Sequence, residues 1–435
     1  MKLEMKTLHT RRSAIATGSL TLLALGLAAC GGGYGASPYA PAADTQAPAE
    51  WSAIAVKAVL DASAATPGGV SPMEESRAYA MAFSAAHDAL NAIDRRYKPY
   101  LSDLRSPGAN ADVAVASAVS TVLKRVLPSQ AAALDAALAD ALAKVPDGNP
   151  KAAGVTLGQQ TALAILAARA ADGSADAQGT YAPAQAPGAY QFTPPFDFAA
   201  FVHWGAVKPF AISTGDQFRV APPFALTDPA YAADFNEVKA LGDARSTTRT
   251  PDQTQIARFW LENTPLSWQR IAMRLAADRR LNGWDQMRLF ALLQAAEADA
   301  YVASFDSKYF YSFWRPLTAI RAAATDGNPD TAADPAWTSL EPAPPIPDHA
   351  SGHAAAAGAG AAVLESVIPG TVAFSHQSTS LPGVTRDFVS IAQAEQEIGA
   401  SRVYLGFHFR RAVSQGLKQG RQVGNWAIQH AMGPV

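Results

Sequence analysis

Cysteine is almost absent from this chain of 435 residues, because Cys30 is the only one. No disulfide can therefore form within the chain, and we find no Cys/His cluster of the zinc-binding type. An excess of charge of one sign is also missing, since 35 basic residues balance 37 acidic ones. This balance gives no indication of nucleic-acid binding. A glycine-rich phosphate loop followed by lysine and a tandem repeat are likewise not found.

Alternating strand patterns are scarce, whereas alanine-rich amphipathic runs are frequent. These runs predict helices over residues 51–63, 73–95, 111–126, 129–144, 151–172, 230–241, 251–262, 266–278, 283–304, 353–367, 387–405 and 412–431. The proline-rich segments at 173–197 and 322–350, and residues 370–386, are expected to be loops. We therefore expect an all-α protein made of helical bundles.

The N-terminal segment has the pattern of a bacterial export signal. A twin arginine at Arg11 and Arg12 precedes a short apolar stretch, which ends in Leu-Ala-Ala-Cys at Cys30. This pattern predicts a lipoprotein-type, twin-arginine-like signal peptide over residues 1–29 and lipidation of Cys30. Residues 30–50 are expected to be a flexible tether. The protein is then exported and anchored to the bacterial membrane facing the periplasm, with the outer membrane favoured, or to the cell surface.

Three short segments carry residues that together suit an oxyanion. They contain Lys308 and Arg315, then Ser351, Gly352 and His353, and finally Arg402 and His408. Each segment alone has an ordinary explanation as a solvated helix face, a capping turn or a core histidine. Taken together, three cations, a helix N-terminus and two imidazoles can hold a tetrahedral or trigonal-bipyramidal anion such as phosphate or vanadate.

The spacing of these residues predicts how they meet. Lys308 and Arg315 are seven residues apart, which places them about 20° apart on one helix face. The proline after Arg315 indicates that this arginine lies near a helix end or kink. Ser351 is a candidate N-cap. Arg402 and His408 are six residues apart, and they converge only if the helix is distorted, which the glycine between them permits.

The order Lys-x6-Arg-Pro, then Ser-Gly-His, then Ser-Arg-x5-His resembles the signature of vanadium-dependent haloperoxidases and type 2 phosphatidic acid phosphatases. The flanking segments at 76–93, 236–260 and 313–321 resemble the bacterial haloperoxidase-like branch in particular. The resemblance covers most of the chain. It implies a helical haloperoxidase- or phosphatase-like domain over residues 51–435, with the oxyanion site within 300–412.

The resemblance also implies roles for the individual residues. The residues that bind a vanadate cofactor, or phosphate, would be Lys308, Arg315, Ser351, Gly352 and Arg402. His408 would bind the vanadium, and His353 would act as the acid–base group. The implied activity is halide oxidation by hydrogen peroxide. The alternative is an acid phosphatase that cleaves phosphomonoesters through a phosphohistidine at His408. A second alternative is a non-catalytic oxyanion-binding lipoprotein.

Two positions depart from the pattern of this family. Ala350 stands where proline is usual, and Ala412 stands where many members carry an aspartate that orients the ligand histidine. A backbone carbonyl, a water or another acid must then orient His408. His349 is either a partner for peroxide or a local structural contact. Contact with a membrane is expected only through the lipid anchor, and the sequence indicates no oligomeric state.

Overall fold

The computed structural model describes residues 44–435, and this part of the chain is built from helices. Its first five α-helices are α1 (Ala47–Ala65), α2 (Pro72–Ile93), α3 (Ala111–Val126), α4 (Ala131–Ala143) and α5 (Asn149–Ala168). The next five are α6 (Pro229–Gly242), α7 (Pro251–Phe259), α8 (Thr264–Asp278), α9 (Gly283–Tyr311) and α10 (Pro316–Arg321). The last three are α11 (Gly352–Val367), α12 (Ile391–Tyr404) and α13 (Arg410–His430). The prediction of an all-α fold is confirmed.

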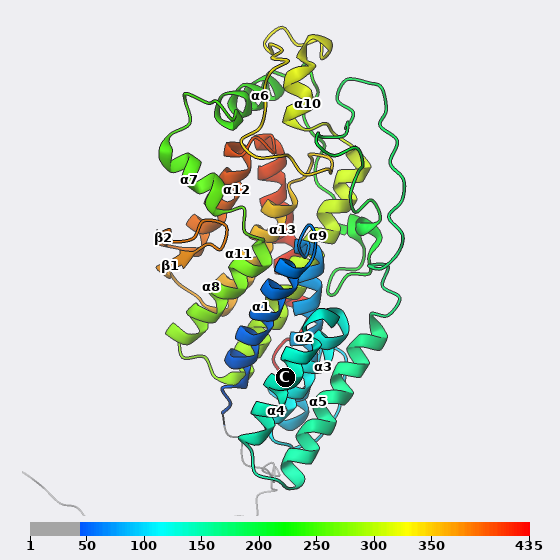
Figure 1. Cartoon of the computed structure of the whole chain (residues 1–435), viewed down its shortest axis with the longest axis vertical. Helices are drawn as coiled ribbons and strands as arrows, with labels where there is room; N and C mark the ends of the chain where they lie inside the picture. The colour runs from blue at the N-terminus through cyan, green and yellow to red at the C-terminus, as the bar shows by residue number, and fades with distance from the viewer. Residues whose placement is uncertain (1–43) are drawn as a thin grey trace, which may run out of the picture. The chain divides into compact units, whose positions relative to one another are not determined.

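Short 3-10 helices punctuate the connections. They are η1 (Pro128–Gln130), η2 (Trp204–Ala206), η3 (Gly215–Phe218) and η4 (Ala323–Thr325). Figure 1 shows α3, α4 and α5 at one end of the described part and α6 and α10 at the other. None of the helices between residues 44 and 435 combines the length and the apolar composition that crossing a bilayer would require.

The long helix α9 packs against helices from both the N-terminal and the C-terminal part of the described chain. It packs against α2 on one side and against α11 and α13 on the other. Its start is set by Asn282, whose side chain accepts hydrogen bonds from the backbone N–H groups of Trp284 and Asp285. Because α9 is surrounded along most of its length, it is buried almost throughout. The C-terminal end of this helix carries Lys308.

Helices α11 and α13 lie unusually close together because glycines line their contact. Gly416, Gly420 and Gly424 recur every four residues on α13 and therefore share one face. A Cβ atom at Gly420 would lie 1.8 Å from the carbonyl oxygen of Ala355 on α11. This close approach brings the start of α13 next to the start of α11, where the Ser351 N–H donates to the Ala412 carbonyl over 3.0 Å.

Several element boundaries differ from the sequence expectation. Helix α1 begins at Ala47, within the range expected to be tether. Helix α9 continues to Tyr311 instead of ending at 304, and the short α10 was not predicted. The expected signal peptide, Cys30 and most of the tether lie outside the described residues.

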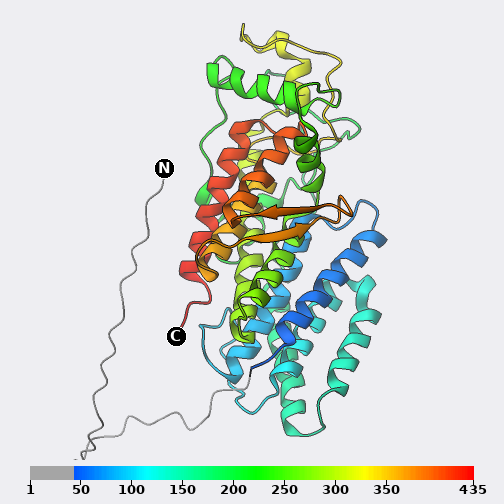
Figure 2. The ribbon, with the colours of Figure 1, turned by 90° about the vertical axis from the view of Figure 1, so that its left-hand side faces the viewer.

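The expected loop at 370–386 contains a small hairpin instead. Strand β1 (Phe374–Gln377) pairs antiparallel with β2 (Thr385–Phe388), which shortens the predicted helix 387–405 to α12. Figure 2 shows this two-stranded ribbon on the outside of the helices. The strands were missed because four residues are too few to show a period of two clearly.

Candidate active site

Lys308 lies in the last full turn of α9 and is completely buried. Its ammonium group donates hydrogen bonds to the carbonyl oxygens of Pro347, at 2.7 Å, and Asp348, at 3.1 Å. The proline-rich loop between α10 and α11 therefore lies against the end of α9. Burial and the neighbouring Arg315 hold the pKa of Lys308 well below its usual value.

Arg315 does not share a helix face with Lys308, and that expectation was wrong. Helix α9 ends at Tyr311, and Ser312 has the left-handed backbone angles φ 44° and ψ 44°. Arg315 has extended backbone as the residue preceding α10, as its following proline requires. Its guanidinium donates to the carbonyls of Ile346, at 2.7 Å, and Phe407, at 2.8 Å.

Ser351, Gly352 and His353 form the N-terminus of α11. Ser351 is the N-cap, and its side chain accepts from the Ala354 N–H over 3.4 Å. A Cβ atom at Gly352 would lie 3.3 Å from the Ser304 hydroxyl, which shows how tightly this turn packs on α9. The helix N-terminus offers backbone N–H groups and partial positive charge to an anion.

Arg402 and His408 meet because α12 ends between them. The helix stops at Tyr404, and Gly406 adopts φ +77°, which turns the chain before α13 begins. The Arg402 guanidinium donates to the Ser401 hydroxyl at 2.9 Å and to the carbonyl of Trp260. The distortion at glycine that the six-residue spacing required is therefore present, as a break between two helices.

The two ring nitrogens of His408 have different partners. Nδ1 lies 2.8 Å from a carboxyl oxygen of Asp348, and Nε2 lies 3.1 Å from Nη1 of Arg315. Since a guanidinium can only donate, Nε2 is the unprotonated nitrogen and Nδ1 carries the proton that binds Asp348. The structure thus identifies Asp348 as the acid that orients His408, in the absence of an acid at Ala412.

Asp348 is fully buried and sits among the cations of the site. Burial raises the pKa of its carboxyl to about 7, although Arg315 and Lys308 act in the opposite direction. The sequence analysis allowed for another acid as the partner of His408 but did not identify Asp348. The available signal was its place beside His349 in the loop that leads into Ser351.

Positive charge dominates the assembled site. Burial, followed by the charges of Arg315, Lys308 and Arg402, lowers the pKa of His408. Burial lowers the pKa of Arg402 to about 9. The Nη2 atom of Arg315 is buried and has no hydrogen-bond partner. Because buried charged donors are costly when unpaired, an oxyanion among these groups would satisfy them.

His353 faces the same region from the first turn of α11. The residue is partly exposed, whereas its Nε2 atom is buried without a hydrogen-bond partner. Burial and the charge of Arg402 lower its pKa well below the usual range. A neutral imidazole with a free ring nitrogen can exchange protons with a bound molecule. The structure therefore brings all seven predicted site residues together, while their individual roles remain predictions.

His349 from the sequence analysis and Asp299 on α9 both have structural contacts. The Nε2 atom of His349 lies 2.8 Å from the carbonyl of Ala221, and its ring packs edge-on against Tyr311. Asp299, on α9, accepts hydrogen bonds from the backbone N–H groups of Phe210, Ala211 and Ile212. Asp299 therefore holds the long connection before α6 rather than facing the site.

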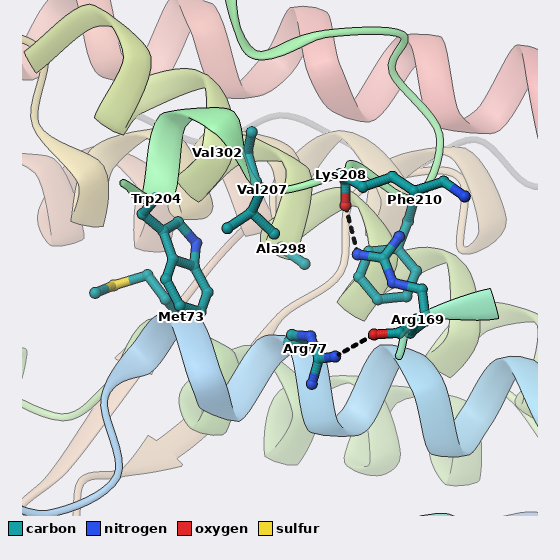
Figure 3. Close-up of a pocket in the computed structure, with 9 residues that line it drawn as sticks. All are labelled: Met73, Arg77, Arg169, Trp204, Val207, Lys208, Phe210, Ala298 and Val302. Atoms are coloured by element: carbon teal, nitrogen blue, oxygen red, sulfur yellow. Dashed lines mark hydrogen bonds between the residues drawn. The ribbon is translucent and has the colours of Figure 1, made fainter. Parts of the chain in front are cut away.

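A separate small pocket lies between α2 and α9 and contains none of these site residues. Figure 3 shows the Arg77 side chain donating to the Arg169 carbonyl and the Arg169 guanidinium pointing to the Lys208 carbonyl. Asp172 accepts hydrogen bonds from both arginines, at 2.8 and 3.0 Å. The cavity of about 10 Å³ has room for one water. Its polar groups are already paired, and it therefore offers no second anion site.

Comparison with known proteins gives consistent results. The family model described as the VCPO second helical-bundle domain matches residues 288–435 of this chain. The vanadium chloroperoxidase of Curvularia inaequalis is 32% identical over 185 residues, which are 35% of this chain and 30% of the fungal protein. The match thus spans less than a third of that relative's length.

Solved bacterial structures are similar over much more of the chain. A bacterial vanadium-dependent iodoperoxidase superposes with a TM-score of 0.76 at 25% identity, over 88% of this chain and 97% of the other. The holo form of a bacterial vanadium-dependent chloroperoxidase gives a TM-score of 0.66 at 19% identity, over 82% and 92% of the two chains. The chain therefore resembles vanadium haloperoxidases, in sequence over its C-terminal third and in fold over most of its length.

Proposed function

We propose that this protein is a vanadium-dependent haloperoxidase that oxidises a halide with hydrogen peroxide at vanadate bound to His408. The observation that carries the proposal is the state of His408. Its Nε2 is unprotonated and faces Arg315, while Asp348 holds the opposite nitrogen. Such an imidazole is ready to bind a metal, and its orientation is set by a carboxylate. The similarity to bacterial haloperoxidases supports the same activity.

The cationic groups around His408 fit the charge of vanadate. Lys308, Arg315 and Arg402 would neutralise its oxygens, and the unpaired Nη2 of Arg315 is an available donor. Ser351 and the Gly352 N–H would add hydrogen bonds at the start of α11. When bound, vanadate supplies a Lewis acid that activates hydrogen peroxide without changing its own oxidation state.

His353 would exchange protons during the reaction. Its lowered pKa keeps the imidazole neutral at neutral pH, and its Nε2 is free to accept a proton from hydrogen peroxide. The overall reaction converts hydrogen peroxide, a halide ion and one proton into hypohalous acid and water. One proton is therefore consumed in each turnover, and it must reach a buried site.

An acid phosphatase is the second candidate, because the same geometry suits it. An unprotonated Nε2 with Nδ1–H bound to a carboxylate is also the arrangement of a nucleophilic histidine. In that reaction Nε2 of His408 would attack phosphorus, and His353 would protonate the leaving alcohol.

One experiment separates the two activities. Purified protein is incubated with vanadate or left untreated, and bromide or iodide oxidation and phosphomonoester hydrolysis are both measured. We expect halide oxidation that depends on vanadate, and we expect His408→Ala to abolish it while the circular dichroism spectrum is unchanged. Full halide oxidation by a folded His408→Ala protein would contradict the ligand assignment. Hydrolysis without halide oxidation would identify a phosphatase, and tight anion binding without either activity would indicate a binding protein.

A further inference from the structure

The turn that follows α7 supplies a hydrogen-bond acceptor to one of the cations of the candidate site. Trp260 caps the C-terminal end of α7, where carbonyl oxygens have no N–H partner within the helix. The Arg402 guanidinium takes this place and donates to the Trp260 carbonyl. Arg402 also donates to the hydroxyl of Ser401, its neighbour on α12, at 2.9 Å. Trp260 therefore ties Arg402 to an element other than its own helix.

The indole of Trp260 is held by α12 and by the hairpin that lies against this helix (Figure 1). Trp260 is 1% exposed, and its Nε1 donates to Glu397 on α12 at 2.9 Å. The Arg386 guanidinium, on β2, binds both oxygens of the same carboxylate at 2.7 and 2.9 Å. The His376 ring, on β1, stacks on the indole, with 5.7 Å between the ring centroids and 16° between the planes. Both strands therefore help to fix the residue whose carbonyl accepts from Arg402.

Glu262, two residues after Trp260, fastens the same turn to the hairpin. Its side chain is completely buried, and it accepts from His376 Nε2 at 3.1 Å and from the Thr379 N–H at 2.6 Å. Ser267 on α8 donates to it as well. Although burial raises the pKa of this carboxyl, the hydrogen bonds from His376 and Ser267 hold it below its usual value. Because a buried charge is costly when a partner moves away, these bonds resist displacement of the turn.

His376 joins the two anchors of this turn. It is 5% exposed, it stacks on Trp260, and it binds Glu262 through Nε2. An apolar side chain would be sufficient for packing alone. An imidazole, in contrast, both stacks on the indole and donates to the carboxylate. The choice of histidine therefore indicates that the position of the turn matters.

The same turn also acts on the second histidine of the candidate site. Burial and the charge of Arg402 lower the pKa of His353, and the backbone carbonyls of Trp260 and Glu262 partly oppose this lowering. A displacement of the turn would therefore affect an arginine of α12 and a histidine of α11 together.

We propose that His376 is a positioning residue of the oxyanion site, which acts through Trp260 on the direction of the Arg402 guanidinium. With His376 in place, the Trp260 carbonyl takes one N–H of Arg402 and leaves other N–H groups of the guanidinium for the anion. Without it, the indole loses its stacking partner, Glu262 loses a donor, and the carbonyl no longer fixes the guanidinium. This role rests on the proposed binding of an oxyanion by Arg402, and it does not depend on halide oxidation.

Anion binding tests this role without turnover. Dissociation constants for vanadate and for phosphate are measured by calorimetry with the wild type and with His376→Ala. We expect the variant to bind both anions about tenfold more weakly, as is typical when the group that orients a binding residue is lost. His376→Gln, whose amide can also donate to Glu262, should recover part of the affinity. His430→Ala is the matched control, since the exposed His430 also stacks on a tryptophan, Trp426, at 3.7 Å and 16°. It should leave both constants unchanged.

A double variant separates positioning from a purely structural role. If His376 acts through Arg402, then His376→Ala should cause no further loss of affinity in an Arg402→Ala protein. Equal losses in the two backgrounds would overturn the proposal, and so would wild-type affinity in a folded His376→Ala protein. If His376→Ala does not fold, Glu397→Ala provides the test, because it removes the acceptor of the Trp260 Nε1–H. We expect weaker anion binding, and unchanged affinity in this variant would reject the proposal.

The wild-type measurements distinguish this proposal from the proposed function. A wild type that binds neither anion would reject both the site and its positioning residue. A wild type that oxidises no halide, combined with weaker vanadate binding by His376→Ala, would reject the activity alone and support the role of His376.

Discussion

At the scale of single residues, the most informative contact is the one between His408 and Asp348. It assigns the proton of the imidazole to Nδ1 and leaves Nε2 facing Arg315. A carboxylate that accepts this proton makes the ring a better ligand and fixes its direction. In this chain, the acid that orients His408 therefore comes from the loop before α11. Many related sequences instead place this acid one helical turn after the histidine.

Asp348→Asn should weaken vanadate binding by about 10- to 100-fold, the usual effect of losing such an orienting group. The variant removes the negative charge opposite Nδ1 while keeping the size of the side chain. Vanadate dissociation constants measured by calorimetry provide the test, with Asp330→Asn as a surface control. Affinity equal to that of the wild type would exclude Asp348 as the orienting residue.

Ala412→Asp provides the opposite comparison. Ala412 is fully buried, and its carbonyl accepts a hydrogen bond from the Ser351 N–H. Because the position is buried, a carboxylate side chain there would be an additional buried charge. With Asp348 in place, we expect this variant to melt at a lower temperature and to bind vanadate no more tightly.

Some residues of the candidate site can be predicted from sequence patterns, and others cannot. The spacing of Lys308, Arg315, Arg402 and His408 predicted residues that the structure brings together, although their roles stay predictions. The partners that complete it, Asp348 and the carbonyl of Trp260, come from loops without a local pattern. Their positions depend on long-range packing, which periodicity and motif spacing do not encode.

At the scale of elements, the contact between α11 and α13 holds the site together. The glycines of α13 allow it to approach α11 so closely that backbone atoms touch, and this sets the position of Ser351 beside Ala412. The two helices contribute His353 at the start of one and the segment after His408 at the start of the other. Their separation therefore controls the width of the candidate site.

Gly420→Ala should destabilise the protein by about 3 kcal/mol, because the added Cβ would lie 1.8 Å from the Ala355 carbonyl oxygen. Urea unfolding gives the free energy, and Gly108→Ala is the matched control, since nothing lies within 4 Å of a Cβ there. A change in stability as small as that of Gly108→Ala would show that the helices separate easily.

Helix positions were predictable from sequence, whereas helix ends were less so. Helix α3 begins at Ala111 and ends at Val126 as expected, because Asn110 caps its start. Helix α9 passes its expected end, and Phe305, Ser307 and Lys308 remain buried beyond residue 304. The turn at Ser312 could not be foreseen, since a left-handed serine has no sequence signal.

At the scale of the whole molecule, the described fold buries several acids that stay protonated. Because the pKa of Glu75 is about 8 in the folded state and 4.5 ordinarily, the folded state keeps this proton longer than the unfolded chain. Its contribution to stability is complete below pH 4.5 and is lost as the pH rises through 8. Glu297 acts in the same direction.

The melting temperature should therefore fall between about pH 6 and about pH 9, and Glu75→Gln should make this fall smaller. Differential scanning calorimetry across this range provides the measurement, with Asp61→Asn on the surface of α1 as control. Equal slopes for the wild type and Glu75→Gln would show that Glu75 is ionised in the folded protein.

The predicted lipid anchor also belongs to this scale, although Cys30 lies outside the described residues. Cys30→Ser should move the protein from the membrane fraction to the soluble fraction, or leave it uncleaved, while halide oxidation is retained. Fractionation followed by immunoblotting measures the distribution. Identical membrane fractions for wild type and variant would reject lipidation.

The three buried cations around His408 have a consequence for competition between anions. If the proposed function is right, Lys308, Arg315 and Arg402 recognise charge and tetrahedral shape, which phosphate and vanadate share. Wherever phosphate is abundant and vanadate scarce, phosphate raises the vanadate concentration required for half occupancy, in proportion to its own concentration divided by its dissociation constant. The fraction of active molecules is then set by the ratio of the two anions in the surroundings. A haloperoxidase with such a site would respond to phosphate depletion even though no residue senses phosphate separately.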